Sequence, residues 1–282
     1  MNSRDSLHRK KICLNGLQSV LLLSILWGAG CGAGDSKKHR PALSDLTPID
    51  LTHSFDKETI YWPTDESGFV LEEVFHGTTD GGYYYEANRF SSAEHGGTHL
   101  DAPIHFAENG LTAEALPLKN LIGPAIKIDV SGKTSANRDY LISVDDVKDW
   151  ESRNGPVPDG SIILFATGYA AGWPNRAQYL GTDLTGPEAI PNLHFPGIAP
   201  ELATWLTSDR SIRAVGIDTP SIDYGQSSDF RTHRILFEHN IPAFENVASM
   251  DALPESGFTV IALPMKIRNG SGGPLRIVAL VP

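Results

Sequence analysis

The segment from residue 94 to residue 106 combines several side chains that bind metal ions. It reads E-H-G-G-T-H-L-D-A-P-I-H-F and holds three of the ten histidines of the chain, His95, His99 and His105, together with Asp101. Imidazole and carboxylate groups at such short spacing are typical ligands of zinc, manganese or a similar divalent ion. The pattern predicts a metal site and disfavours the simpler interpretation of a polar surface loop.

Two local geometries would bring these side chains together. His95 and His99 are four residues apart, as two ligands on one face of a helix would be. Two glycines between them and a proline soon afterwards disfavour a helix. In an extended segment, His99, Asp101 and His105 would all project from one face, because side chains alternate along a strand. We therefore expect an extended segment, with the glycines turning His95 back toward that face.

Strands that alternate with helices are expected to position this segment. Apolar runs predict strands over residues 49–53, 81–90, 125–130, 161–165, 214–218, 258–263 and 275–281. Helices are predicted over residues 143–150, 199–207 and 231–239. Ser143 and Asp146 form the N-terminal signal of the first helix, and Pro200 stands at the start of the second. The alternation indicates an α/β fold with a mixed central sheet and flanking helices.

Domain organisation follows from the same pattern. Residues 48–282 show no internal repeat and no break in composition, so we expect one domain there. The run Gly-Ser-Gly-Gly at 270–273 lies between two apolar segments and is predicted to form a hairpin turn.

His233 and Glu245 are two further candidates for the metal site. His233 lies near the start of the third predicted helix, and Glu245 follows twelve residues later, after that helix has ended. A chain reversal between them would bring their side chains together. Taken alone, each residue is better explained as a surface or capping residue, so the residue types leave this pairing open.

Several other functions are disfavoured. The chain has no G-x-S-x-G nucleophile motif, no P-loop and no G-x-G-x-x-G motif after a strand. The two cysteines, Cys13 and Cys31, both precede the predicted domain, which excludes catalysis by a thiol within it. A net charge of −11 argues against binding to nucleic acid, which requires a basic surface.

The first thirty residues have the organisation of an export signal. A basic start with Arg4, Arg9, Lys10 and Lys11 precedes an apolar run, and small residues lead to Cys31. The ending G-A-G-C resembles a bacterial lipobox, in which the cysteine is lipidated. We expect a signal peptide over residues 1–30, a tether over residues 31–47, and an exported lipoprotein that faces the periplasm or the cell exterior. The membrane would be contacted only through lipid on Cys31, although an uncleaved N-terminal anchor is an alternative.

The histidine-rich segment also resembles a known family. The signature H-x-G-T-H-x-D-x-P-x-H is matched without a gap by His95, Gly97, Thr98, His99, Asp101, Pro103 and His105. By this signature the chain resembles the cyclase family of metal-dependent hydrolases, which includes bacterial kynurenine formamidase and isatin hydrolase. The similarity runs from residues 49–53 to residues 273–276 and includes G-I-D-T-P-S-I-D at 216–223. The resemblance implies a swivelling β/β/α domain and a homodimer or homotetramer.

This resemblance implies the metal ligands. His95, His99 and Asp101 would bind a first divalent cation, zinc or manganese. Asp101 would bridge to a second cation held by His233 and Glu245. Each subunit would then bind one or two cations.

The resemblance also implies the remaining roles. His105 matches the catalytic histidine, and Trp62, in Y-W-P-T-D, matches a tryptophan that contacts an aromatic substrate. Thr64 stands where the formamidases have glycine, and this departure puts the formamidase substrate in question.

The expected reaction is hydrolysis of a C–N bond in a small aromatic amide or lactam. A divalent cation lowers the pKa of water from 15.7 to about 7. An imidazole with a pKa near 6.5 can pass the proton of that water to the leaving nitrogen. Isatin and N-formylkynurenine are the two nearest substrate candidates, and carbamates or lactones would use the same chemistry. The alternative is a surface lipoprotein that binds metal or solute without catalysis.

Overall fold

The computed structural model describes residues 42–65 and 67–282. All of them belong to one compact unit of the chain. The predicted signal peptide, Cys31 and most of the predicted tether lie outside the described residues. Within the described part of the chain, no helix combines the length and the apolar character that crossing a membrane requires.

The secondary structure alternates strands with short helices. The strands are β1 (Thr47–Asp50), β2 (Val70–Thr78), β3 (Tyr84–Ser91), β4 (His99–Asp101), β5 (Ile122–Asp129), β6 (Leu141–Ile142), β7 (Ser161–Ala166), β8 (Gly197–Ile198), β9 (Ile212–Ile217), β10 (Ala243–Glu245), β11 (Phe258–Pro264) and β12 (Gly272–Val281). The α-helices are α1 (Leu118–Leu121), α2 (Ser131–Thr134), α3 (Val144–Asn154), α4 (Arg176–Leu180), α5 (Pro200–Asp209) and α6 (Arg231–Glu238).

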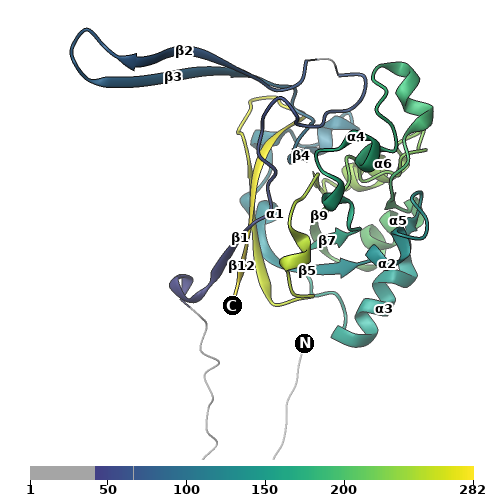
Figure 1. Ribbon diagram of the computed structural model, residues 1–282. Helices are drawn as coiled ribbons and strands as arrows, with labels where there is room; N and C mark the ends of the chain where they lie inside the picture. Colours follow the sequence, from purple (N-terminus) through teal and green to yellow (C-terminus); the bar gives the residue numbers. More distant parts are fainter. Residues whose placement is uncertain (1–41, 66) are drawn as a thin grey trace, which may run out of the picture. The chain divides into compact units, whose positions relative to one another are not determined.

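The main sheet is mixed and closes on itself. Its strand order is β1-β12-β11-β5-β7-β9-β10-β4, and β4 also pairs with β12. The pairs β5–β7, β7–β9 and β9–β10 are parallel, whereas β4, β11 and β12 pair antiparallel with their neighbours. This arrangement confirms the predicted α/β fold with a mixed central sheet (Figure 1).

Two hydrophobic cores lie on opposite sides of the parallel strands. Along β7, Ile162 and Leu164 contribute to the core that also contains β11 and β12, whereas Ile163 and Phe165 contribute to the core beneath α3, α5 and α6. Because side chains alternate along a strand, both faces of β7 are buried, which explains its continuous apolar sequence. The two cores hold β4, β10 and the start of α6 in fixed positions.

The three longer helices form where the sequence predicts them. The backbone N–H of Ser143 donates to the carboxylate of Asp146 over 2.7 Å, as expected for the start of α3. This helix continues to Asn154, four residues beyond the predicted end, and stops at Gly155, whose φ is 85°. Pro200 is the first residue of α5.

One local prediction is wrong, and a second is correct only in part. His105 does not continue the extended segment of His99 and Asp101, because Pro103 starts a 3₁₀ helix, Pro103–His105. The hairpin between β11 and β12 forms, but only Gly270 and Ser271 of the glycine run lie in its connection, since Gly272 already belongs to β12 and pairs with Asp101 of β4. The whole connection spans residues 265–271 and so begins five residues before the run.

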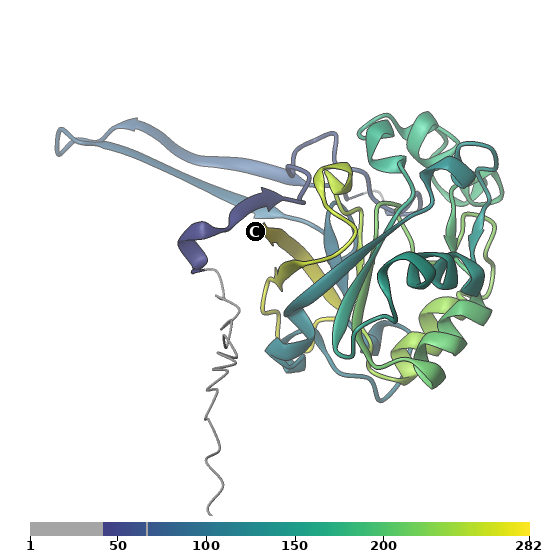
Figure 2. The same ribbon diagram turned by 90° about the horizontal axis from the view of Figure 1, so that it is seen from below.

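The strand predicted over residues 81–90 belongs to a separate two-stranded sheet. It begins at Tyr84 as β3 and pairs antiparallel with β2, a strand that the apolar pattern did not predict. The two strands form a long hairpin that projects from the body of this unit (Figures 1 and 2). We call residues 70–91 the arm.

Candidate metal and active site

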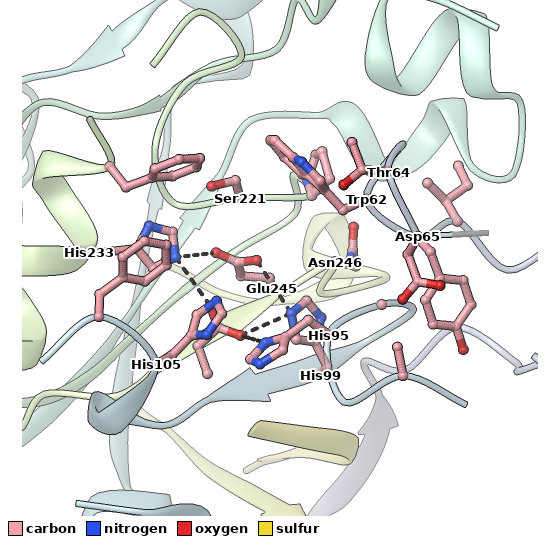
Figure 3. Close-up of a pocket in the computed structure, with 18 residues that line it drawn as sticks. Trp62, Thr64, Asp65, His95, His99, His105, Ser221, His233, Glu245 and Asn246 are labelled. Carbon is pink, nitrogen blue, oxygen red and sulfur yellow. Dashed lines mark hydrogen bonds and ion pairs between the residues drawn. The ribbon is translucent and has the colours of Figure 1, made fainter. Parts of the chain in front are cut away.

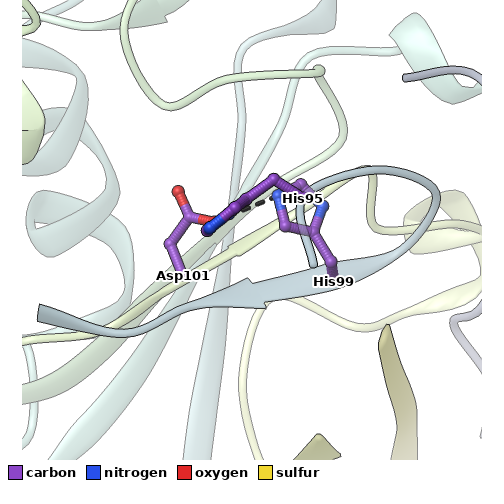
Figure 4. Close-up of side chains that lie close together, drawn as sticks. All are labelled: His95, His99 and Asp101. Carbon is purple, nitrogen blue, oxygen red and sulfur yellow. Dashed lines mark hydrogen bonds and ion pairs between the residues drawn. The ribbon is translucent and has the colours of Figure 1, made fainter. Parts of the chain in front are cut away.

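Strand β4 carries two of the predicted ligands, and the turn before it carries a third. His99 and Asp101 lie on β4, between β10 and β12. Gly97 has a φ of 57°, a left-handed conformation that favours glycine, and it turns the chain so that His95 faces the strand. Gly96 packs against the Tyr61 ring, where a Cβ would lie 2.1 Å from a ring carbon. The predicted return of His95 to this face is confirmed (Figure 4).

The first group of ligands comprises His95, His99 and Asp101. Oδ1 of Asp101 lies 2.6 Å from Nδ1 of His95 and 3.0 Å from Nε2 of His99. One ligand atom from each residue lies within 4.8 Å of the other two, as metal coordination requires.

The second group comprises Asp101, His233 and Glu245. Nε2 of His233 is 3.1 Å from Oδ2 of Asp101 and 3.1 Å from Oε1 of Glu245. Helix α6 supplies His233, and β10 supplies Glu245 directly opposite His99 in the β4–β10 register. The structure therefore brings together all five residues proposed from the sequence, and Asp101 is shared by the two groups.

Each histidine of these groups uses its other ring nitrogen to bond a supporting group. Nδ1 of His99 donates to the Gly97 carbonyl at 2.9 Å, and Nδ1 of His233 lies 2.6 Å from a carboxylate oxygen of Asp223. Such bonds fix the tautomer and leave the Nε2 lone pair directed at the site. Asp223 is held in turn by the backbone N–H groups of Thr232 and His233.

His95 is oriented by Ser271, the residue directly before β12. Its Nε2 lies 2.8 Å from Oγ of Ser271, and Ser271 donates to Glu94 at 2.7 Å. The Nδ1 lone pair of His95 is thereby left facing Asp101. Neither Ser271 nor Asp223 was identified from the sequence as a site residue, although each lies in a segment that the sequence singled out, the glycine run and the block at 216–223.

The pKa of each buried acid or histidine in the site depends on the charges of its neighbours. Burial lowers the pKa of His99, but the carboxylates of Asp101 and Glu245 outweigh burial and raise it to about 9. Burial also opposes ionisation of Asp101, yet the neighbouring histidines hold its pKa well below the usual value. For Glu245, burial and the nearby Asp101 carboxylate both raise the pKa.

This donor set fits a divalent cation. Asp101 and Glu245 are each only 2–3% exposed, and two buried carboxylates side by side are costly unless positive charge compensates them. Imidazole nitrogens and carboxylate oxygens, each oriented by a supporting hydrogen bond, are the ligands that zinc and manganese accept.

A cavity of about 350 Å³ opens above these ligands (Figure 3). Its walls include Trp62, Thr64, Phe106 and Phe230, together with all five candidate ligands and His105. His105 stacks on His95 with ring centroids 3.8 Å apart, and burial lowers the pKa of His105 to about 4. The ring of Trp62 meets that of Phe230 edge to face at 6.3 Å. The cavity thus combines a polar floor with an aromatic wall.

Comparisons with known proteins agree with this geometry. The model of the family described as putative cyclase matches residues 49–224. Isatin hydrolase of Roseibium aggregatum is 32% identical over 210 residues, which cover 71% of this chain and 77% of that protein. Kynurenine formamidase of Bacillus cereus is 29% identical over 241 residues, which cover 85% of this chain and 93% of the relative.

A solved structure extends the similarity to the fold. Isatin hydrolase A from Ralstonia solanacearum superimposes with a TM-score of 0.77 at 29% identity, covering 85% of this chain and 93% of that one. The superposition covers most of the domain, beyond the part that the family model matches. The chain therefore belongs to the putative cyclase family and shares the α/β fold of its isatin hydrolase relatives.

Proposed function

We propose that this chain is a metal-dependent hydrolase that cleaves the C–N bond of a small aromatic amide or cyclic amide. The observation that carries the proposal is the position of an aromatic-walled cavity directly above two ligand groups that share Asp101. The similarity to an isatin hydrolase and to kynurenine formamidases supports the same reaction class.

The cofactor in this proposal is zinc or manganese, with one or two cations per subunit. His95, His99 and Asp101 would hold the first, and Asp101 with His233 and Glu245 would hold a second. A bound cation supplies a Lewis acid that lowers the pKa of water from 15.7 to about 7 and polarises a carbonyl group. The opposite orientation of the two Asp101 oxygens supports a bridging role for this carboxylate.

His105 is the proposed proton carrier. Its imidazole lines the cavity and stacks on His95, so it lies beside the ligands without belonging to either group. A neutral imidazole accepts the proton of the attacking water and then donates it to the leaving nitrogen. Transfer of this proton breaks the C–N bond and leaves an amine and a carboxylate, which stay on one ring-opened molecule for a lactam and separate for an open-chain amide.

Trp62 is the proposed contact for the aromatic part of the substrate. Together with Phe106 and Phe230 it forms an apolar wall of the cavity, beside the ligand His233. We favour an isatin-like lactam over N-formylkynurenine, because Thr64 replaces the glycine of the formamidases at the edge of this cavity. N-formylkynurenine is the second candidate, supported by the similarity to the formamidases over 85% of this chain.

An assay of the purified chain tests this proposal. The protein is freed of metal, reloaded with manganese or zinc, and incubated with isatin, N-formylkynurenine and a simple lactam. The expected result is metal-dependent ring opening of isatin, with slower or no reaction of the other two. Tight metal binding without turnover of any of these compounds would instead support the non-catalytic lipoprotein.

We also propose that the protein is exported and anchored through lipid on Cys31. The basic start, the apolar run and the sequence G-A-G-C support this localisation. Cys31→Ser should release the protein from the membrane fraction and abolish incorporation of labelled fatty acid. Unchanged membrane association of that variant would contradict the lipid anchor and would favour an uncleaved N-terminal anchor.

A further inference from the structure

Asn246 is a buried residue of the cavity to which the proposed reaction assigns no role. It follows Glu245 directly at the end of β10, lines the cavity and is only 2% exposed (Figure 3). Its φ is 52°, a left-handed conformation that asparagine adopts more readily than most residues. A buried amide is costly unless its hydrogen bonds are satisfied. The partners of the Asn246 amide therefore indicate what this residue does.

The side chain of Asn246 bonds a carbonyl that already supports a metal ligand. Its Nδ2 donates to the Gly97 carbonyl at 2.6 Å, and Nδ1 of His99 donates to the same oxygen at 2.9 Å. A carbonyl oxygen has two lone pairs, so these two donors satisfy it completely. The Gly97 carbonyl cannot turn away from His99 without also breaking its bond to Asn246.

The backbone of Asn246 holds the next residue of the same turn. Oγ1 of Thr98 donates to the Asn246 carbonyl at 2.7 Å, and the N–H of Asn246 donates to the Thr219 carbonyl at 2.9 Å. Asn246 thus contacts both residues that precede His99, while it is itself adjacent to Glu245. One ligand of each group, His99 and Glu245, therefore depends on this residue for its place.

Tyr179 fixes the orientation of the Asn246 amide. The Gly97 carbonyl can only accept a hydrogen bond, so Nδ2 of Asn246 must face it and Oδ1 must face Tyr179. The hydroxyl of Tyr179, on α4, donates to this Oδ1 at 2.7 Å, with the Asp218 carbonyl at 3.0 Å as a second acceptor. Tyr179 is fully buried in the hydrophobic cluster against which Trp62 packs, so water does not compete for its hydroxyl.

We propose that Asn246 is a positioning residue for His99, and that Tyr179 acts on His99 through Asn246. The bonds run from the Tyr179 hydroxyl to the Asn246 amide, then to the Gly97 carbonyl and to Nδ1 of His99. They keep Nε2 of His99 directed at the cation of the first ligand group. Groups that orient a ligand in this way contribute to metal affinity without contacting the metal. The inference rests on the metal site of the proposed function and not on its substrate.

Zinc titration of the full-length chain tests this role, with a competing chromophoric chelator to measure affinity. Asn246→Gly removes the amide and keeps a residue that tolerates the left-handed backbone. The affinity for zinc should fall about tenfold, as expected when a supporting group of a ligand is lost. Circular dichroism should show the same fold in every variant.

Asn240→Gly is the matched control. Asn240 has a φ of 54°, and its side chain accepts a hydrogen bond from the Leu111 backbone N–H at 2.9 Å, but it does not line the cavity. This variant also loses an asparagine that bonds a distant backbone group. Its melting temperature should fall, and its affinity for zinc should equal that of the wild-type chain.

A double-mutant cycle tests the route from Tyr179. Tyr179→Phe removes one hydroxyl and keeps the ring, and it should also lower the affinity for zinc, so the test does not depend on the stability of Asn246→Gly. Tyr179→Phe should cause no further loss in a chain that already carries Asn246→Gly, because the amide that transmits its effect is absent.

Unchanged zinc affinity in Asn246→Gly, or an equal loss in Asn240→Gly, would overturn the role of Asn246. Additive losses in the double variant would overturn the route from Tyr179. A wild-type chain that binds no zinc would overturn the metal site and this role with it. The expected losses in a chain that binds zinc but hydrolyses no amide would support this role and contradict only the proposed reaction.

Discussion

At the scale of single residues, the carboxylate of Asp101 belongs to both ligand groups. Oδ1 faces His95 and His99, while Oδ2 faces His233. The sequence was sufficient to identify this group, because ligand-type residues at short spacing carry a recognisable pattern. It was not sufficient to identify Ser271, which lies 176 residues from His95 and contacts it only through the fold.

Replacement of His105 separates metal binding from proton transfer. His105→Ala should retain the metal content of the wild-type chain but lower kcat by about 10²- to 10⁴-fold, the usual contribution of a general acid–base group. Metal analysis and steady-state kinetics provide the two readouts. His239→Ala is the control, because His239 is exposed and belongs to neither ligand group. Full activity of His105→Ala would rule out the role proposed for this residue.

Asp223 should act on metal affinity through His233. The Asp223→Asn variant loses the charge that fixes the His233 ring over 2.6 Å, so metal affinity should fall about 10- to 100-fold. Competition with a chromophoric chelator measures this change. Asp229→Asn, an exposed acid in the same loop, should have no effect. Equal metal affinity of wild type and Asp223→Asn would contradict the supporting role of this carboxylate.

At the scale of elements, sequence patterns predict most of the strands and helices that surround the site. They do not predict where the backbone of one strand packs closely against another. Residues 162–165 are apolar throughout, and the predicted run 161–165 that contains them is indeed a buried strand. The part of the run 270–273 that lies in a strand and not in the predicted turn has a steric explanation. Gly272 lies on β12 against β4, where a Cβ would be 2.5 Å from the Leu100 carbonyl oxygen and 2.6 Å from the His95 ring. The requirement for glycine there comes from packing, which a sequence pattern does not report.

Gly272→Ala tests that steric requirement. The added methyl group must displace either the backbone of β4 or the ring of His95, so the variant should unfold at lower temperature and bind metal more weakly. The loss of stability should be about 1–3 kcal/mol, as for other overpacked sites. Gly132→Ala is the control, since apart from the adjoining chain no heavy atom lies within 4 Å of a Cβ at that position. A melting temperature equal to that of wild type would show that β4 and β12 accommodate the methyl group.

At the scale of the whole molecule, one partly buried histidine outside the metal site links stability to pH. His53 stacks on Trp173 with ring centroids 4.3 Å apart, and its Nε2 is buried without a partner among the described residues. Burial lowers the pKa of His53 to about 4, from 6.5. The unfolded chain therefore binds this proton more readily than the folded chain. Stability is unaffected by this group above pH 6.5 and decreases as the pH falls from 6.5 toward 4.

His53→Phe isolates that contribution, because phenylalanine keeps the ring contact and does not titrate. The free energy of unfolding of the wild-type chain, relative to that of the variant, should fall by up to about 3 kcal/mol between pH 7 and pH 4. Denaturant unfolding at several pH values measures the difference. Parallel stability profiles for the two proteins would exclude His53 as the source of the pH dependence.

The central claim is that a divalent cation held at Asp101 is required for hydrolysis, and reconstitution with metal tests it most directly. Wild-type chain and Asp101→Asn are stripped with chelator, titrated with manganese or zinc, and assayed on isatin, with Asp183→Asn as an exposed control. The wild-type and control chains should regain activity in proportion to the metal bound. Asp101→Asn should bind less than one cation per chain and turn over at least 10³-fold more slowly, because both ligand groups lose their shared charge. Full activity of the stripped wild-type chain, or of Asp101→Asn, would contradict the account.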